Sequence, residues 1–168
     1  YWVMKNLIDL TNEEMADVFA RWNEGKLRSY LIEITSNILR HKDKSGGYLI
    51  DKILDAAGQK GTGKWSVINA MELGMPLGLI ATAVFERSLS AQELRHLASK
   101  QFLCKHTLPV YNKAELVKEI FSALYASKLV SYAQGFAVLQ RASDAFGWNL
   151  DLASIARMWR GGCIIRSI

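Results

Sequence analysis

The residues with the clearest capacity for chemistry lie at positions 58–65, which read GQKGTGKW. Glycine lets the backbone come close to a bound group, and Lys60 and Lys64 add mobile positive charges. A helix that begins here would supply unpaired backbone N–H groups and the positive end of its dipole. This combination of donors and cations predicts a site for an oxyanion.

Residues 58–64 also match the G-x-x-x-x-G-K pattern of nucleoside-triphosphate P-loops. In a P-loop the next residue is a Ser or Thr that ligates Mg²⁺, whereas here it is Trp65. A P-loop also follows a buried strand, but the apolar positions of 49–57 have helical spacing and predict a helix. Both differences disfavour an NTPase. A purely structural alternative stays open. In it the glycines only end one helix and begin the next, and the two lysines are solvated and bind nothing.

The elements that must position this loop are helices, because apolar residues recur at the helical period and show no sustained alternation. The sequence therefore predicts an all-α fold with one long central helix, capped by Asn112 and ended by Gly147. Capping boxes are predicted at Thr11 and Ser90, and Gly135 is predicted to mark a close helix crossing. The predicted helices cover approximately residues 1–8, 12–25, 26–41, 49–57, 66–73, 77–87, 91–100, 113–146 and 152–159.

Two short helices after the loop give a geometric argument. Helix 66–73 is followed by a turn, with Pro76 at a favoured first helical position, and then by helix 77–87. At about 1.5 Å rise per residue the two helices have similar lengths, so the second returns to the level of the loop if they pack antiparallel. Arg87 would then return to the level of Lys60 and could approach the same anion. The pattern equally allows a surface arginine that the helix dipole stabilises.

Length and composition suit one domain with a sizeable core, since half of the 168 residues are hydrophobic. The net charge of +5 favours anionic ligands, but lysines and arginines are dispersed among acids, which disfavours nucleic acid as a partner. No apolar run reaches the ~18 residues of a membrane span. The two cysteines and three histidines are too scattered for a disulfide framework or a metal site, which predicts a reduced, cytoplasmic setting.

Five segments, in order, resemble the decarboxylating 6-phosphogluconate dehydrogenases, and together they extend over nearly the whole chain. They are residues 31–35 (LIEIT), 53–65 (ILDAAGQKGTGKW), 83–87 (AVFER), 125–136 (YASKLVSYAQGF) and 158–167 (MWRGGCIIRS). The resemblance implies the multi-helix C-terminal-type domain of that family, which binds substrate and forms the dimer surface. Residues 1–168 are then expected to be part of this single domain, truncated at both ends, with the dinucleotide-binding domain absent from this chain.

The resemblance also implies a ligand and a reaction. Members of the family oxidise 6-phosphogluconate at C3 with NADP⁺, and the 3-keto acid loses CO₂ to give ribulose 5-phosphate in the pentose phosphate pathway. By motif, Lys60, Thr62 and Arg87 would hold the substrate's phosphate, which agrees with the geometric argument above. The parent protein is expected to be a homodimer, with no nucleic acid or membrane as a partner.

The family's catalytic groups do not map onto this chain. Its G-x-G-x-x-G fingerprint occurs nowhere in the sequence, and its catalytic lysine and acid precede the position of Tyr1. We therefore expect no catalytic, cofactor-binding or metal-binding residue here and an inactive fragment. Two alternatives stay open: a stand-alone, non-catalytic domain that binds a phosphorylated sugar acid or a protein partner, and a related hydroxyacid dehydrogenase with another substrate.

Overall fold

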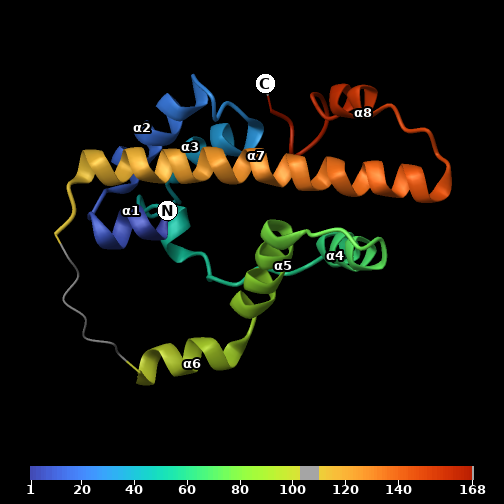
Figure 1. Ribbon diagram of the computed structural model, residues 1–168. Helices are drawn as coiled ribbons and strands as arrows, with labels where there is room; N and C mark the ends of the chain where they lie inside the picture. Colours follow the sequence, from blue (N-terminus) through green and yellow to red (C-terminus); the bar gives the residue numbers. More distant parts are fainter. Residues whose placement is uncertain (103–109, 168) are drawn as a thin grey trace. The chain divides into compact units, whose positions relative to one another are not determined.

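The computed structural model describes residues 1–102 and 110–167, and within these ranges the chain is helical (Figure 1). The helices are α1 (Trp2–Leu7), α2 (Asn12–Asn23), α3 (Tyr30–Arg40), the 3₁₀ helix η1 (Leu49–Lys52), α4 (Thr62–Glu72), α5 (Gly78–Ser90), α6 (Glu93–Gln101), α7 (Lys113–Phe146) and α8 (Leu152–Met158). The described part holds no strand, only isolated bridges such as that between Ser29 and Ser167. The predicted all-α fold is confirmed. None of the described helices has the length and apolarity needed to cross a membrane.

The chain divides into two compact units. Unit 1 comprises Tyr1–Ile53, Thr107–Ala126 and Ala153–Ile168, and unit 2 comprises Leu54–His106 and Ser127–Leu152. Helix α7 contributes its first turns to unit 1 and its remainder to unit 2. The expectation that the whole chain is part of one domain stays a prediction.

Unit 1 is built around the apolar faces of α2 and α3. Thr11 and Glu14 form the predicted capping box at the start of α2, which is confirmed. Trp22 packs edge-on against Phe19 and against Phe121 of α7, with ring centroids 5.1 and 5.8 Å apart. The largest fully buried side chains of this core are Met4, Met15, Leu27 and Leu39.

The predicted helix over 49–57 is wrong. Only Leu49–Lys52 forms a single 3₁₀ turn, and residues 53–61 are irregular. The apolar side chains that suggested a helix find no core: Ile53 is 58% exposed and Leu54 is 73% exposed. A short amphipathic helix is stable only when its apolar face packs, so this segment stays open.

Unit 2 begins its helical part inside the glycine loop. Helix α4 starts at Thr62, four residues before the predicted start at Ser66. Gly61 makes this possible, because its φ of +97° lies in the region that favours glycine. The first bond of the helix runs from the Trp65 N–H to the Gly61 carbonyl at 2.9 Å.

Two other predicted starts need correction. Pro76 is not the first helical position of α5, which begins at Gly78. The capping box at Ser90 is also wrong, because Ser90 is the last residue of α5, and the Gln92 side chain that precedes α6 makes no capping bond. By contrast, the Asn112 side chain accepts bonds from the N–H groups of residues 114 and 115, which confirms the predicted cap of α7.

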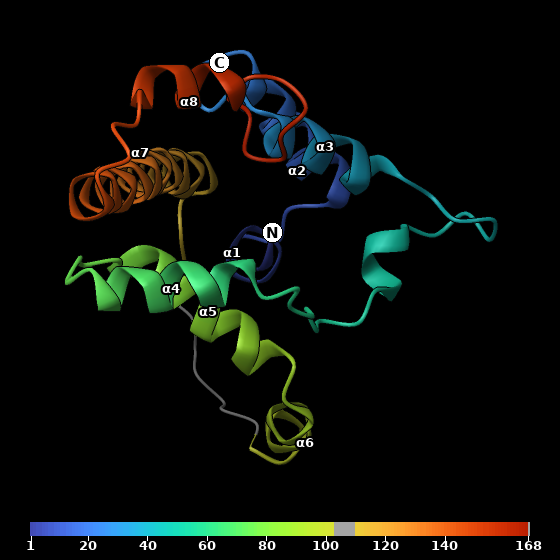
Figure 2. The same ribbon diagram turned by 90° about the vertical axis from the view of Figure 1, so that its right-hand side faces the viewer.

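The close helix crossing lies at Gly63 and not at Gly135 as predicted. A methyl group added at Gly135 would meet no described atom within 4 Å. A methyl group at Gly63 would lie 2.9 Å from a γ-carbon of Val84 on α5, too close for any real contact. Glycine at position 63 therefore sets how near α4 can come to α5. The two helices contact each other and lie side by side in Figure 2.

We expect Gly63→Ala to destabilise unit 2. The methyl group gains about 1 kcal/mol of helix propensity, but crowding the stiff, β-branched Val84 costs about 1–3 kcal/mol. The urea midpoint followed by circular dichroism should fall, and Val84→Ala in the same chain should restore it. Gly135→Ala is the matched control and should raise the midpoint, because its methyl group has space. A Gly63→Ala midpoint as high as that of Gly135→Ala would contradict the close crossing.

Candidate anion-binding site

A pocket in unit 2 lies between the glycine loop, the start of α4 and one face of α5. Its volume is about 240 Å³. Pockets for whole drug-sized ligands begin at about 300 Å³, so this one suits a single group of a larger ligand. It is lined by Gln59, Lys60, Gly61, Thr62, Gly63, Ile80, Ala83, Val84 and Arg87.

The structure brings the three residues predicted from the sequence to this one pocket. Lys60 and Thr62 enter from the loop and the first residue of α4, and Arg87 enters from the last turns of α5. The returning helix thus carries Arg87 to the level of Lys60, as the geometric argument required. The other interpretation, a surface arginine that the helix dipole stabilises, stays open, because Arg87 is exposed and lies in the last turn of α5.

The start of α4 adds backbone donors to the pocket. The N–H groups of Thr62, Gly63 and Lys64 precede the first bond within the helix, so they belong to the turn whose amides have no intrahelical acceptor. The same turn is the positive end of the helix dipole. Donors and dipole both favour a negatively charged group beside Thr62.

Arg87 is oriented by the loop itself. Its Nε–H donates to the carbonyl oxygen of Gly58 at 2.6 Å. This bond uses one of the five N–H donors of the guanidinium and fixes the plane of the group. The terminal nitrogens carry the other four donors, in the fork geometry that matches two oxygens of a phosphate or carboxylate.

The charge balance of the lining favours an anion. Among the described lining residues, two side chains are cationic, Lys60 and Arg87, and none is a carboxylate. The other lining residues of α5 are apolar and form one wall: Ile80, Ala83 and Val84. An apolar wall displaces water from one side of the site, which lowers the local dielectric and strengthens each charge-assisted bond.

The sequence analysis named three of the lining residues and missed the wall on α5. The pattern was nevertheless present: positions 80, 83, 84 and 87 follow the i, i+3, i+4, i+7 spacing of one helix face. The first three of these positions are apolar and the fourth is Arg87, so one face of α5 carries both the apolar wall and the arginine. Gln59 was missed because nothing in its spacing sets it apart within the loop.

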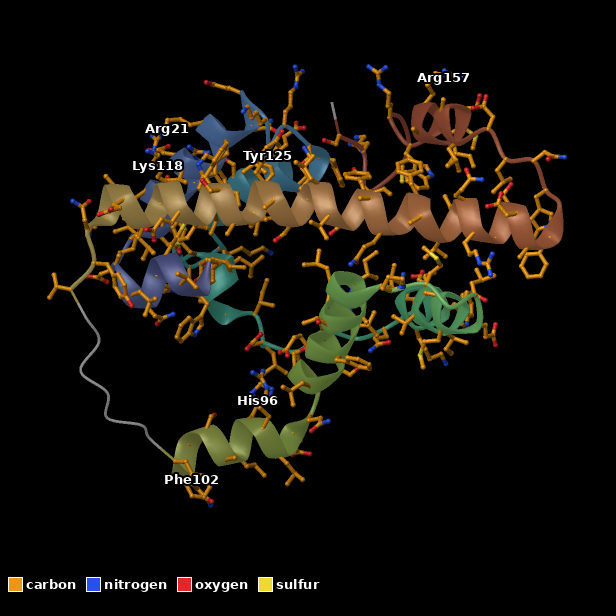
Figure 3. The ribbon with its side chains drawn as sticks, viewed as in Figure 1. Arg21, His96, Phe102, Lys118, Tyr125 and Arg157 are labelled. Atoms are coloured by element: carbon orange, nitrogen blue, oxygen red, sulfur yellow. The ribbon has the colours of Figure 1, made fainter. Side chains whose placement is uncertain are left out.

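Other candidate groups do not join this site. The described part of the chain holds no cluster of three or more His, Cys, Asp or Glu side chains that could bind a metal ion. His96 lies on α6 (Figure 3), and its Nε2 is 3.3 Å from the Ser90 carbonyl oxygen. Cys104 and His106 lie outside the described residues.

The chain matches known proteins along its whole length. Residues 1–168 match the family described as "6-phosphogluconate dehydrogenase, C-terminal domain". The chain is 51% identical to the decarboxylating 6-phosphogluconate dehydrogenase of Schizosaccharomyces pombe and 50% identical to that of Mus musculus, over 100% of its own length. It covers only 34% and 35% of those two proteins, so it spans about a third of the curated relatives that it matches.

A solved structure gives the same result for the fold. The chain resembles a 6-phosphogluconate dehydrogenase of Plasmodium falciparum with a TM-score of 0.92 and 44% identity, over 99% of this chain and 37% of that one. That protein was studied in its apo form, with its cofactor NADP⁺ and with its substrate 6-phosphogluconate. Since the family match extends from residue 1 to residue 168, the chain belongs to the 6-phosphogluconate dehydrogenase C-terminal domain family.

Proposed function

We propose that this chain supplies the substrate-phosphate site of a decarboxylating 6-phosphogluconate dehydrogenase, which oxidises 6-phosphogluconate with NADP⁺ and releases CO₂ and ribulose 5-phosphate. The observation that carries the proposal is the convergence of Lys60, Thr62 and Arg87 on one pocket. The relatives that match along the whole chain bear the name of this enzyme, and a related solved structure is described with this substrate.

The pocket supports this role by its chemistry. Lys60 offers a point charge, Arg87 a bidentate fork and Thr62 a hydroxyl, so three chemically different donors surround one group. A phosphate is a double anion with several acceptor oxygens and can use all of them. The phosphate lies far from the carbon that is oxidised, so its binding energy serves to orient the sugar acid for reaction.

The cofactor belongs to another part of the proposed enzyme. NADP⁺, when bound, accepts the hydride from C3 of the substrate. The sequence has no G-x-G-x-x-G turn, which holds the pyrophosphate in dinucleotide-binding folds, so we assign the dinucleotide to a part of the enzyme outside this chain. We assign no catalytic residue to this chain. The pentose phosphate pathway and the cytoplasm, as the setting of the enzyme, are further parts of the proposal.

Substitutions in the pocket test the phosphate assignment in the protein at its native length. Lys60→Ala or Arg87→Ala should raise the KM for 6-phosphogluconate about 10- to 100-fold, because each removes a charge-assisted hydrogen bond of about 1.5–3 kcal/mol. The preference for 6-phosphogluconate over unphosphorylated gluconate, measured as the ratio of kcat/KM values, should shrink by the same factor. Steady-state kinetics with both substrates measures these quantities.

Lys64→Ala is the matched control for this test. Lys64 belongs to the same motif and carries the same charge, but it is not among the described lining residues. Its loss should change the KM less than threefold, as expected for a solvated charge whose field is screened. If Lys60→Ala and Arg87→Ala behave like Lys64→Ala, the phosphate site lies elsewhere.

We also propose that the protein forms a homodimer. Large apolar side chains are exposed in unit 1, among them Trp2 at 65% and Ile164 at 66%. Large apolar side chains exposed to this extent are expected where another protein segment covers the surface. A second copy of the chain is the occupant that a closed, two-fold assembly would place there.

Sedimentation velocity of the native-length protein at micromolar concentration should show a species of twice the chain mass. The same species should persist in 1 M NaCl, because burial of apolar surface is not screened by salt, whereas surface ion pairs are. A monomer at low salt would contradict the dimer proposal. A dimer that dissociates in salt would show that charges, not the apolar side chains, hold it together.

A further inference from the structure

We propose that Ser88 and Ser90, at the C-terminal end of α5, are positioning residues for the phosphate-binding loop. The inference rests on the proposed function and extends it to residues outside the pocket. Neither serine is among the described residues that line the site. Both act on residues 57–59, the three residues immediately before Lys60, which we call the strap.

Each residue of the strap is held by a group near the end of α5. The Ala57 N–H donates to Ser90 Oγ at 3.3 Å. The Gly58 carbonyl accepts from Arg87 Nε at 2.6 Å. The Gln59 side-chain amide donates to Ser88 Oγ. Three successive residues of an irregular segment are therefore tied to one helix end.

The two serine hydroxyls are oriented for this task. Ser88 Oγ donates its hydrogen to the Val84 carbonyl at 3.0 Å, and Ser90 Oγ donates to the Arg87 carbonyl at 2.8 Å. A hydroxyl has one hydrogen and two lone pairs, so a hydroxyl that donates back to its own helix turns its lone pairs outward. Both serines thus present acceptors, and the strap supplies the matching N–H donors.

The strap has little else to place it. Residues 53–61 form no helix, and their apolar side chains Ile53 and Leu54 are exposed. Upstream of the strap, the Asp55 carboxylate pairs with Arg95 of α6 at 3.1 Å. Lys60 follows the strap directly, so its position relative to Arg87 depends on these bonds. A loop held in its binding conformation loses less conformational freedom when the anion binds.

The experiment compares Ser88→Ala with the parent protein at its native length. We expect the KM for 6-phosphogluconate and the inhibition constant of inorganic phosphate to rise together by about two- to tenfold, the worth of one partly exposed hydrogen bond. The KM for NADP⁺ should stay within twofold. Ser88→Thr should restore both phosphate-dependent constants, because it returns the hydroxyl, and Ser88→Ala combined with Ser90→Ala should exceed the single change.

Ser122→Ala is the matched control. Ser122 makes the same kind of back-bond, from its Oγ to the Lys118 carbonyl at 3.1 Å, on α7 in unit 1. It should leave all constants unchanged. A Ser88→Ala protein that loses melting temperature or kcat but keeps both phosphate-dependent constants would overturn the inference, because that result is a purely structural effect.

The variants separate this inference from the proposed function. If Lys60→Ala raises the KM for 6-phosphogluconate and Ser88→Ala does not, the positioning role is wrong and the phosphate site stands. If neither Lys60→Ala nor Arg87→Ala raises it, the phosphate site is wrong and the positioning role falls with it. If the KM for 6-phosphogluconate rises in all three alanine variants and Ser88→Thr restores it, the result supports both the phosphate site and the positioning role.

Discussion

The candidate site depends on the contact between the glycine loop and the C-terminal half of α5. The contact has an apolar part and a polar part: Gly63 lies where any side chain would strike Val84, and the Gly58 carbonyl accepts from Arg87. The first sets how close the two segments come, and the second fixes their register. Without close approach the loop and α5 would not line one pocket. Without the register Lys60 and Arg87 would not face the same group.

This contact explains two of the three glycines in the motif. Gly61 takes a φ of +97° and lets α4 begin at Thr62, so that the helix amides point at the pocket. Gly63 removes the side chain that would push α5 away. The requirement at Gly61 is conformational and the requirement at Gly63 is steric, although the two residues are identical in the sequence.

In unit 2 the charged and the apolar residues of the pocket come from different positions. The cations come from the loop and from the end of α5, while the residues between them on α5 are apolar and form the wall. A cation near the C-terminal end of a helix is stabilised by the dipole, so Arg87 is held in place by the same helix that presents it. The site therefore combines a donor-rich loop with a rigid apolar support.

The helical class and the caps at Thr11 and Asn112 could be predicted from the sequence, and its motifs named three candidate phosphate ligands, because period, capping and motif are local properties. Residues 49–57 do not form the predicted helix, because their apolar side chains have no core to pack against. This depends on the packing of the folded chain and not on the local pattern. The close helix crossing lies at Gly63 and not at Gly135, and Ser90 ends α5 and does not begin a helix. Each of these depends on which surface lies opposite a residue, and sequence spacing carries no information about the opposite surface.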